Sequence, residues 1–230
     1  MRFEEFKAQA ANSRAEIFQE IFAHQRAAVK IKKAGVAVKN LEKIFDATLA
    51  VSHQKGFHAM TLRDLSRESG LSMGALYSYF SSKDELLDLI QDQGRLTVHR
   101  ALSERIETIP DAAGKLTAAV QTHLYLSEIY YRWFYFSYME TKNLSKEQQK
   151  KAIESELFTE KVFIDILEQG CKEGVFSVAD TALTAAAIKA LLQDWYLKRW
   201  KYTRRNITVE QYADFVLNVI RAYIYSKQRG

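Results

Sequence analysis

Residues that break helices are scarce in this chain: Pro110 is the only proline among 230 residues, and there are nine glycines. Proline removes a backbone donor and glycine is costly inside a helix, so long stretches without either favour helices. Sandwiches and barrels need turn residues about every 8 to 12 positions, and doubly wound α/β folds need glycine-rich crossings. The chain supplies neither pattern. We therefore predict an all-α fold, with a length that suits one large domain or two modest ones.

Capping signals predict where the helices of the first half begin and end. Apolar residues from Phe3 to Phe22 keep helical spacing and predict a leading amphipathic helix. A basic connector follows, and Asn40 is the expected N-cap of a helix that stops at Gly56. Three further helices are expected up to about Glu107, and their cap signals are Thr61 with Asp64, Gly70 as a stop, Ser72, and Ser82 with Glu85.

The second half has longer helical stretches. One or two helices are expected from Asp111 to about Lys142, followed by one that Ser145 and Gln148 cap. Asp180 is expected to cap a helix running to about Arg204, and Thr208 with Gln211 caps the last, which carries an apolar stripe.

Positive charge is concentrated near two of the short helices. From Arg26 to Lys83 there are ten Lys or Arg against four Asp or Glu, a net charge of +6, whereas the whole chain carries +5. Such an imbalance favours a polyanionic partner, although an ordinary solvated helix face is the alternative. The residues Thr61 to Lys83 contain two short capped helices separated by a turn at Gly70 to Ser72, which is the pattern of a helix-turn-helix.

From Leu41 through Leu87 the sequence resembles the DNA-binding domain of TetR/AcrR-type transcriptional regulators. The matching motifs are KGF at Lys55 to Phe57, T-x-R-D-L from Thr61, G-L-S-x-G-x-L-Y-x-Y-F from Gly70, and S-K-D-E-L-L from Ser82. The resemblance implies a three-helix helix-turn-helix domain at residues 39–87 and a helical ligand-binding and dimerisation domain at 88–230. Residues 1–38 would be an N-terminal helical extension with a basic connector, serving either as a DNA-contacting arm or as a solvated extension.

The same resemblance implies which residues meet an operator in double-stranded DNA. The recognition helix would run from Ser72 to Tyr79, with Met73, Gly74 and Ala75 near base edges and Tyr77, Ser78 and Tyr79 near bases or phosphates. Thr61, Arg63 and Lys83 would lie on or near the DNA backbone. Many family members have Lys at the position of Met73, so apolar contact, for instance with a thymine methyl, is expected there.

The family mechanism would be repression by a homodimer that a small-molecule ligand releases from its operator. The last two helices combine small residues (Ala182, Ala185, Ala186 and Ala190) with an apolar stripe, as expected of a four-helix interface between two copies. The inducer is expected to be lipophilic or aromatic. Candidate pocket residues, for each of which core packing is the alternative, are Tyr125, Tyr130, Trp133, Phe134, Tyr138 and Trp195.

Other functional classes lack support in the sequence. We find no catalytic motif, no metal site among the five histidines, and no cofactor-binding motif, so an enzyme is not expected. The single cysteine, Cys171, excludes an internal disulfide and fits a reducing compartment. No apolar run approaches the roughly 20 residues of a membrane span, so we expect a cytoplasmic protein without membrane contact. A helical protein-interaction module, or an activator using the same helix-turn-helix, is the alternative function.

Overall fold

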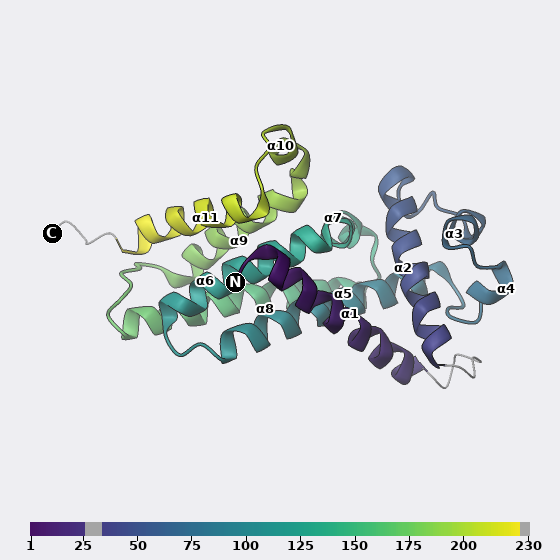
Figure 1. Ribbon diagram of the computed structural model, residues 1–230, viewed down its shortest axis with the longest axis horizontal. Helices are drawn as coiled ribbons and strands as arrows, with labels where there is room; N and C mark the ends of the chain where they lie inside the picture. Colours follow the sequence, from purple (N-terminus) through teal and green to yellow (C-terminus); the bar gives the residue numbers. More distant parts are fainter. Residues whose placement is uncertain (26–33, 226–230) are drawn as a thin grey trace. The chain divides into compact units, whose positions relative to one another are not determined.

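The computed structural model describes residues 1–25 and 34–225, and every regular element in them is a helix (Figure 1). The all-α prediction is therefore confirmed. Lys30, Lys32 and Lys33 of the basic connector, part of the segment proposed as a DNA-contacting arm, lie outside the described residues.

The described residues of the first part of the chain form five α-helices of very different length. They are α1 (Phe3–Gln25), α2 (Ala34–Lys55), α3 (Leu62–Ser69), α4 (Met73–Leu76) and α5 (Lys83–Glu107). The prediction that Asn40 caps α2 is wrong, because α2 begins at Ala34 and Asn40 lies within it. The Asn40 side chain instead donates a hydrogen bond to the Tyr79 hydroxyl, 3.0 Å away. The α-helical part of the expected recognition helix is also shorter than predicted, since turns replace helix after Leu76.

The second part holds the longer helices. They are α6 (Ala112–Ile129), α7 (Tyr131–Glu140), the short 3-10 helix η1 (Thr141–Asn143), α8 (Lys146–Lys172), α9 (Thr181–Leu197), α10 (Arg199–Arg204) and α11 (Val209–Ile224). The sequence predicted one helix from Asp180 to about Arg204, whereas the structure breaks it at Lys198, whose backbone leaves the helical region.

Most of the expected caps form. Thr61 with Asp64 and Thr208 with Gln211 are complete capping boxes, and Ser72 and Asp180 accept from backbone amides three residues on. Two boxes form only in part. Ser82 caps Glu85, but the Glu85 carboxylate turns to Ser81, and Ser145 caps Gln148, whose amide oxygen accepts from Arg95 instead.

The described fold divides into two compact units. The helix-turn-helix unit contains residues 8–97 and 132–148, and the C-terminal unit contains residues 1–7, 98–131 and 149–230. This division falls inside α5 and assigns α7 to the first unit, whereas the sequence suggested a boundary at residue 87. Among the described residues, no helix has both the length and the apolar character that crossing a bilayer requires.

Candidate nucleic-acid interface

A tight turn joins α3 to α4. Gly70 ends α3 with φ +69°, a left-handed conformation that favours glycine because other residues carry a Cβ. Ser72 then starts α4 with extended backbone and accepts a hydrogen bond from the Ala75 amide at 3.2 Å. Only Leu71 lies between these two caps, so the directions of the two helices are set locally.

A small apolar core supports the two helices from behind. Leu65 of α3 and Leu76 of α4 are fully buried, and Phe80 is 3% exposed. They lie in the unit whose α2 buries Leu41, Ile44 and Phe45. Leu62 and Leu71, which the sequence also assigned to this core, are only partly buried. With this inner face fixed by burial, the opposite face of α4 is left for other contacts.

The outer surface of α4 is open. Tyr77 is 55% exposed, Ser72 and Gly74 are exposed, and Met73 and Ala75 are partly exposed. A Cβ added at Gly74 would have no atom within 4 Å, so packing within the chain does not require a glycine there. An Ala at this position would be favoured in an isolated helix by roughly 1 kcal/mol. The position therefore suits the close approach of an external partner to the backbone.

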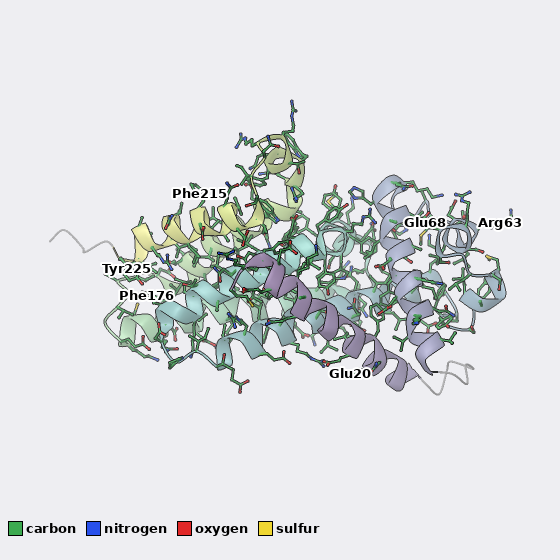
Figure 2. The ribbon with its side chains drawn as sticks, in the orientation of Figure 1. Glu20, Arg63, Glu68, Phe176, Phe215 and Tyr225 are labelled. Atoms are coloured by element: carbon green, nitrogen blue, oxygen red, sulfur yellow. The ribbon has the colours of Figure 1, made fainter. Side chains whose placement is uncertain are left out.

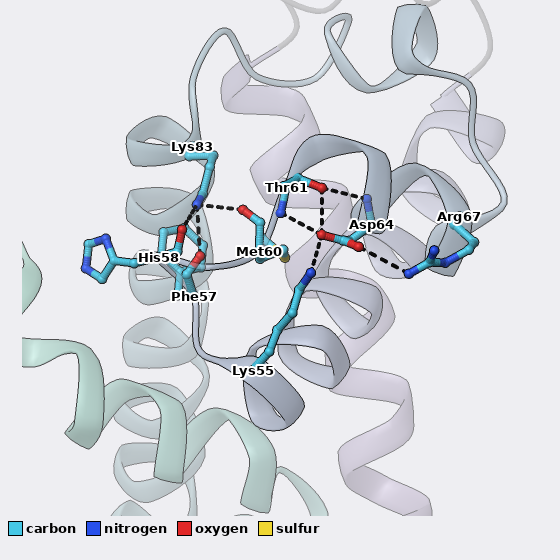
Figure 3. A network of polar contacts seen from close by, with 8 residues as sticks. All are labelled: Lys55, Phe57, His58, Met60, Thr61, Asp64, Arg67 and Lys83. Carbon is cyan, nitrogen blue, oxygen red and sulfur yellow. Dashed lines mark hydrogen bonds and ion pairs between the residues drawn. The ribbon is translucent and has the colours of Figure 1, made fainter.

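The carboxylate of Asp64 organises the start of α3 (Figure 3). It accepts from the Thr61 amide at 2.8 Å and the Thr61 hydroxyl at 2.6 Å, and Lys55 and Arg67 form ion pairs with it. The hydrogen bond from Lys55, followed by those from Thr61, holds the pKa of Asp64 well below its ordinary value. Lys55 and Arg67 were not expected as partners of Asp64, although both belong to the basic segment. Arg63, by contrast, is exposed and extends outward from α3 (Figure 2).

Lys83 lies at the start of α5 and binds the loop between α2 and α3 (Figure 3). Its Nζ donates to the carbonyl oxygens of Phe57 (2.8 Å), His58 (3.1 Å) and Met60 (2.8 Å). The amine also lies 4.9 Å from the centre of the Phe57 ring. Burial lowers the pKa of Lys83, and the nearby Asp84 and Glu140 oppose that shift. Three bonds to carbonyls use all three donors of the ammonium group, so in this structure Lys83 fastens the loop.

Two of the expected DNA contacts have inward-facing polar atoms. The Ser78 hydroxyl donates to the Ala75 carbonyl at 2.6 Å, and Tyr79 is only 3% exposed, with its hydroxyl accepting from Asn40. Burial raises the pKa of Tyr79, and the hydrogen bond from Asn40 opposes this. Of the ten residues expected at DNA, Tyr79 therefore presents almost no surface.

Three candidate pocket residues belong to the C-terminal unit. Tyr125 is 3% exposed and makes edge contacts with the rings of Phe3 and Phe6, 5.3 and 5.6 Å between centroids. Trp195 is fully buried, and its Nε1 donates to Glu128 at 3.0 Å. Tyr130 is partly exposed. Tyr125 and Trp195 thus take part in packing within the chain.

The other three candidates belong to the helix-turn-helix unit. The Trp133 indole lies directly over Gly94 and donates to the Ile90 carbonyl at 3.1 Å, which links α7 to α5. Phe134 makes an edge contact with Trp133 at 5.1 Å and is 7% exposed, whereas Tyr138 is 53% exposed. These six residues are thus divided between two units and between core and surface.

The outer faces of α9 and α11 carry large exposed apolar side chains. Leu183 is 70% exposed, Phe215 59%, Tyr223 54% and Val219 41%, and the small residues Ala182, Ala186, Ala187 and Ala190 are exposed on α9. Ala185, which the sequence grouped with this face, is fully buried instead. A concentration of large exposed apolar side chains is typical of a protein interface.

Comparison with known proteins identifies both parts of the chain. The family described as "Bacterial regulatory proteins, tetR family" matches residues 44–90, and "Tetracyclin repressor-like, C-terminal domain" matches residues 110–220. The HTH-type transcriptional repressor KstR2 of Rhodococcus jostii is 25% identical over 77% of this chain and 87% of its own.

Solved structures agree with these matches. The TetR family regulator PfmR of Thermus thermophilus superposes with a TM-score of 0.71 at 27% identity, covering 78% of this chain and 97% of its own. The regulator FadR of Bacillus subtilis, solved in complex with stearoyl-CoA, has the same fold with a TM-score of 0.62 at 20% identity, covering 78% of this chain and 96% of its own.

Proposed function

We propose that this chain, which belongs to the TetR family of bacterial regulatory proteins, represses transcription by placing α4 in the major groove of an operator. The family makes it a transcriptional regulator and not an enzyme. The observation that carries the proposal is the open outer surface of α4, where Tyr77 is 55% exposed and Gly74 has no neighbour that would explain a glycine.

The residues divide into three roles in this proposal. Met73, Gly74 and Ala75 approach base edges, with Met73 suited to a thymine methyl. Bases or phosphates are contacted by a second group of residues, Thr61, Arg63, Ser72 and Tyr77. Ser78, Tyr79 and Lys83, which the family resemblance also placed at DNA, act here mainly by holding α4 and its supporting loop in position, because their polar atoms are engaged within the chain.

Repression requires two copies. TetR-family regulators act as dimers, and the exposed apolar faces of α9 and α11 are the surface we propose for that contact. A two-fold dimer reads two half-sites roughly 34 to 36 Å apart, and a ligand that favours another spacing releases it.

The inducer we propose is lipophilic or aromatic. The core is rich in aromatic side chains, and the structurally similar FadR was solved with stearoyl-CoA. A thermal-shift screen with long-chain acyl-CoA and aromatic compounds tests this point. Ligands that neither stabilise the protein nor release it from DNA would refute it.

Gel-shift titration with the DNA upstream of the gene that encodes this chain tests operator binding. Tyr77→Ala should weaken binding by about tenfold or more, whereas Tyr138→Ala, a tyrosine of matching exposure (53%) on α7, should leave it unchanged. Arg63→Ala should lower the slope of log affinity against log salt by about 1, because one phosphate contact is lost. Equal affinity for the wild type and both α3–α4 variants would contradict the proposed surface.

A further inference from the structure

The segment between α9 and α11 is unusually basic and projects from the C-terminal unit. We call residues 198–206 the α10 knob. Five of its residues are Lys or Arg and none is acidic. In Figure 1 the knob rises above the right-hand, N-terminal end of α11, and Figure 2 shows Phe215 on the same upper side of that helix. Phe215 is part of the exposed apolar face described above.

Stacked aromatic rings hold the inner side of the knob. Trp195 stacks on Tyr202 with 4.9 Å between centroids and on Tyr212 of α11 with 5.0 Å. The rings of Tyr202 and Tyr212 also approach to 4.6 Å. All three residues are at least nine-tenths buried. The knob is thereby anchored to both helices that flank it.

Two carboxylates complete the anchor. Glu128 of α6 accepts from Trp195 Nε1 and, through both its oxygens, from Arg199 at 2.8 and 2.7 Å. Asp194 accepts from Lys201, Tyr202 and Lys198, the last at 2.7 Å. Burial alone would raise the pKa of Asp194, but these hydrogen bonds outweigh it and lower the pKa to about 2. Asp194 therefore stays charged and keeps the knob fixed at neutral pH.

The outer side of this rigid knob carries exposed side chains. Trp200 is 63% exposed, and Arg204 and Arg205 are exposed. Within the described part of the chain, neither guanidinium forms a hydrogen bond or ion pair. Trp and Arg are the residue types most enriched among interface hot spots, and rigid presentation reduces the entropy that binding costs. The knob thus has the composition and the fixed shape of a binding element.

We propose that the α10 knob clasps a second copy of this chain at the edge of the α9–α11 face. The proposal rests on the dimer of the proposed function and adds a contact to it. Because the knob and the exposed Phe215 lie on the same side of α11, a copy that packs against Phe215 is positioned to reach the knob. Trp200 then covers apolar surface on that copy, and Arg204 and Arg205 pair with carboxylates at the interface rim.

Sedimentation velocity of the full chain tests the clasp. Trp200→Ser should raise the dimer dissociation constant by at least about tenfold, as expected for loss of a hot-spot tryptophan. Arg204→Glu with Arg205→Glu should also weaken the dimer, and this effect should shrink at high salt because ion pairs at a rim are screened. As a charge-matched control, Lys146→Glu with Lys172→Glu, both exposed on α8, should not change it.

Iodide quenching of tryptophan fluorescence gives an independent measurement on the unaltered protein. Trp133 and Trp195 are 9% and 0% exposed, so Trp200 is the indole that iodide reaches in a single copy. Quenching should fall as protein concentration rises through the dimer dissociation constant. Unchanged quenching, or a Trp200→Ser protein that dimerises like the wild type, would overturn the clasp.

Phe215→Glu distinguishes failure of the clasp from failure of the proposed α9–α11 dimer. If Phe215→Glu abolishes the dimer but Trp200→Ser does not affect it, the clasp is wrong and the α9–α11 dimer stands. If Phe215→Glu also leaves the dimer intact, the proposed dimer face itself is wrong, and the clasp is refuted with it. Circular dichroism should show unchanged helix content in each variant.

Discussion

Replacing Lys83 by Met removes the three donors that fasten the α2–α3 loop while keeping most of the apolar stem. Hydrogen bonds to charged groups contribute about 1.5 to 3 kcal/mol each. The His58 carbonyl is exposed and can bind water instead, whereas those of Phe57 and Met60 are partly buried. Allowing for such solvation, we expect Lys83→Met to lower the free energy of unfolding by about 2 to 3 kcal/mol. For a chain of this length that is a fall in Tm of roughly 5 to 10 °C.

The assay is thermal unfolding of the full chain without DNA, with circular dichroism as the signal that reports Tm. Lys43→Met is the matched control, since Lys43 is an exposed lysine of α2 in the same unit, and its Tm should stay within about 1 to 2 °C of the wild type. If Lys83→Met melts like the wild type but loses operator binding, the loop-fastening role is refuted and Lys83 acts directly on DNA.

Three further substitutions probe the same unit. Asp64→Asn should make Tm fall less steeply between pH 5 and pH 2. The folded-state pKa of Asp64 is depressed, so its contribution to stability is present above the unfolded-state pKa and is lost as pH falls towards the folded-state pKa. An equally steep fall of Tm in the variant would contradict this. Gly74→Ala should raise unfolding free energy by up to about 1 kcal/mol and weaken operator binding, and tighter binding would argue against close DNA approach. Gly94→Ala should destabilise by about 3 kcal/mol in a urea titration, because its methyl overlaps the Trp133 indole, and an unchanged midpoint would show that the indole can move.

The capping signals carried most of the fold prediction because caps are local. Thr61, Ser72, Asp180 and Thr208 each act on an amide three residues away, so the information is contained in four consecutive residues. Asn40 failed for the opposite reason. Its partner is Tyr79, 39 positions away, and a contact of that separation gives no periodic signal in the sequence.

The candidate DNA surface was predictable in its main features and not in its details. Periodicity correctly separated the buried Leu65 and Leu76 from the exposed Tyr77. It could not show that Tyr79 turns inward or that Lys83 meets three carbonyls, because their partners, Asn40 and the loop at residues 57–60, lie more than 20 positions away in the sequence. The family motif indicates which positions are candidates for DNA contact, whereas tertiary packing determines where each side chain points.

The break between α9 and α10 shows the same limit in the C-terminal unit. No glycine or proline lies between Thr181 and Arg204, so local propensity predicts an uninterrupted helix. The break is held instead by the Glu128 carboxylate, 71 residues from Arg199, and by Tyr212 stacking on Trp195 across the turn. Those long-range contacts bury one tryptophan and expose another five residues later. Without knowledge of them, Trp195 and Trp200 are equivalent in the sequence, and only Trp200 is available to a partner.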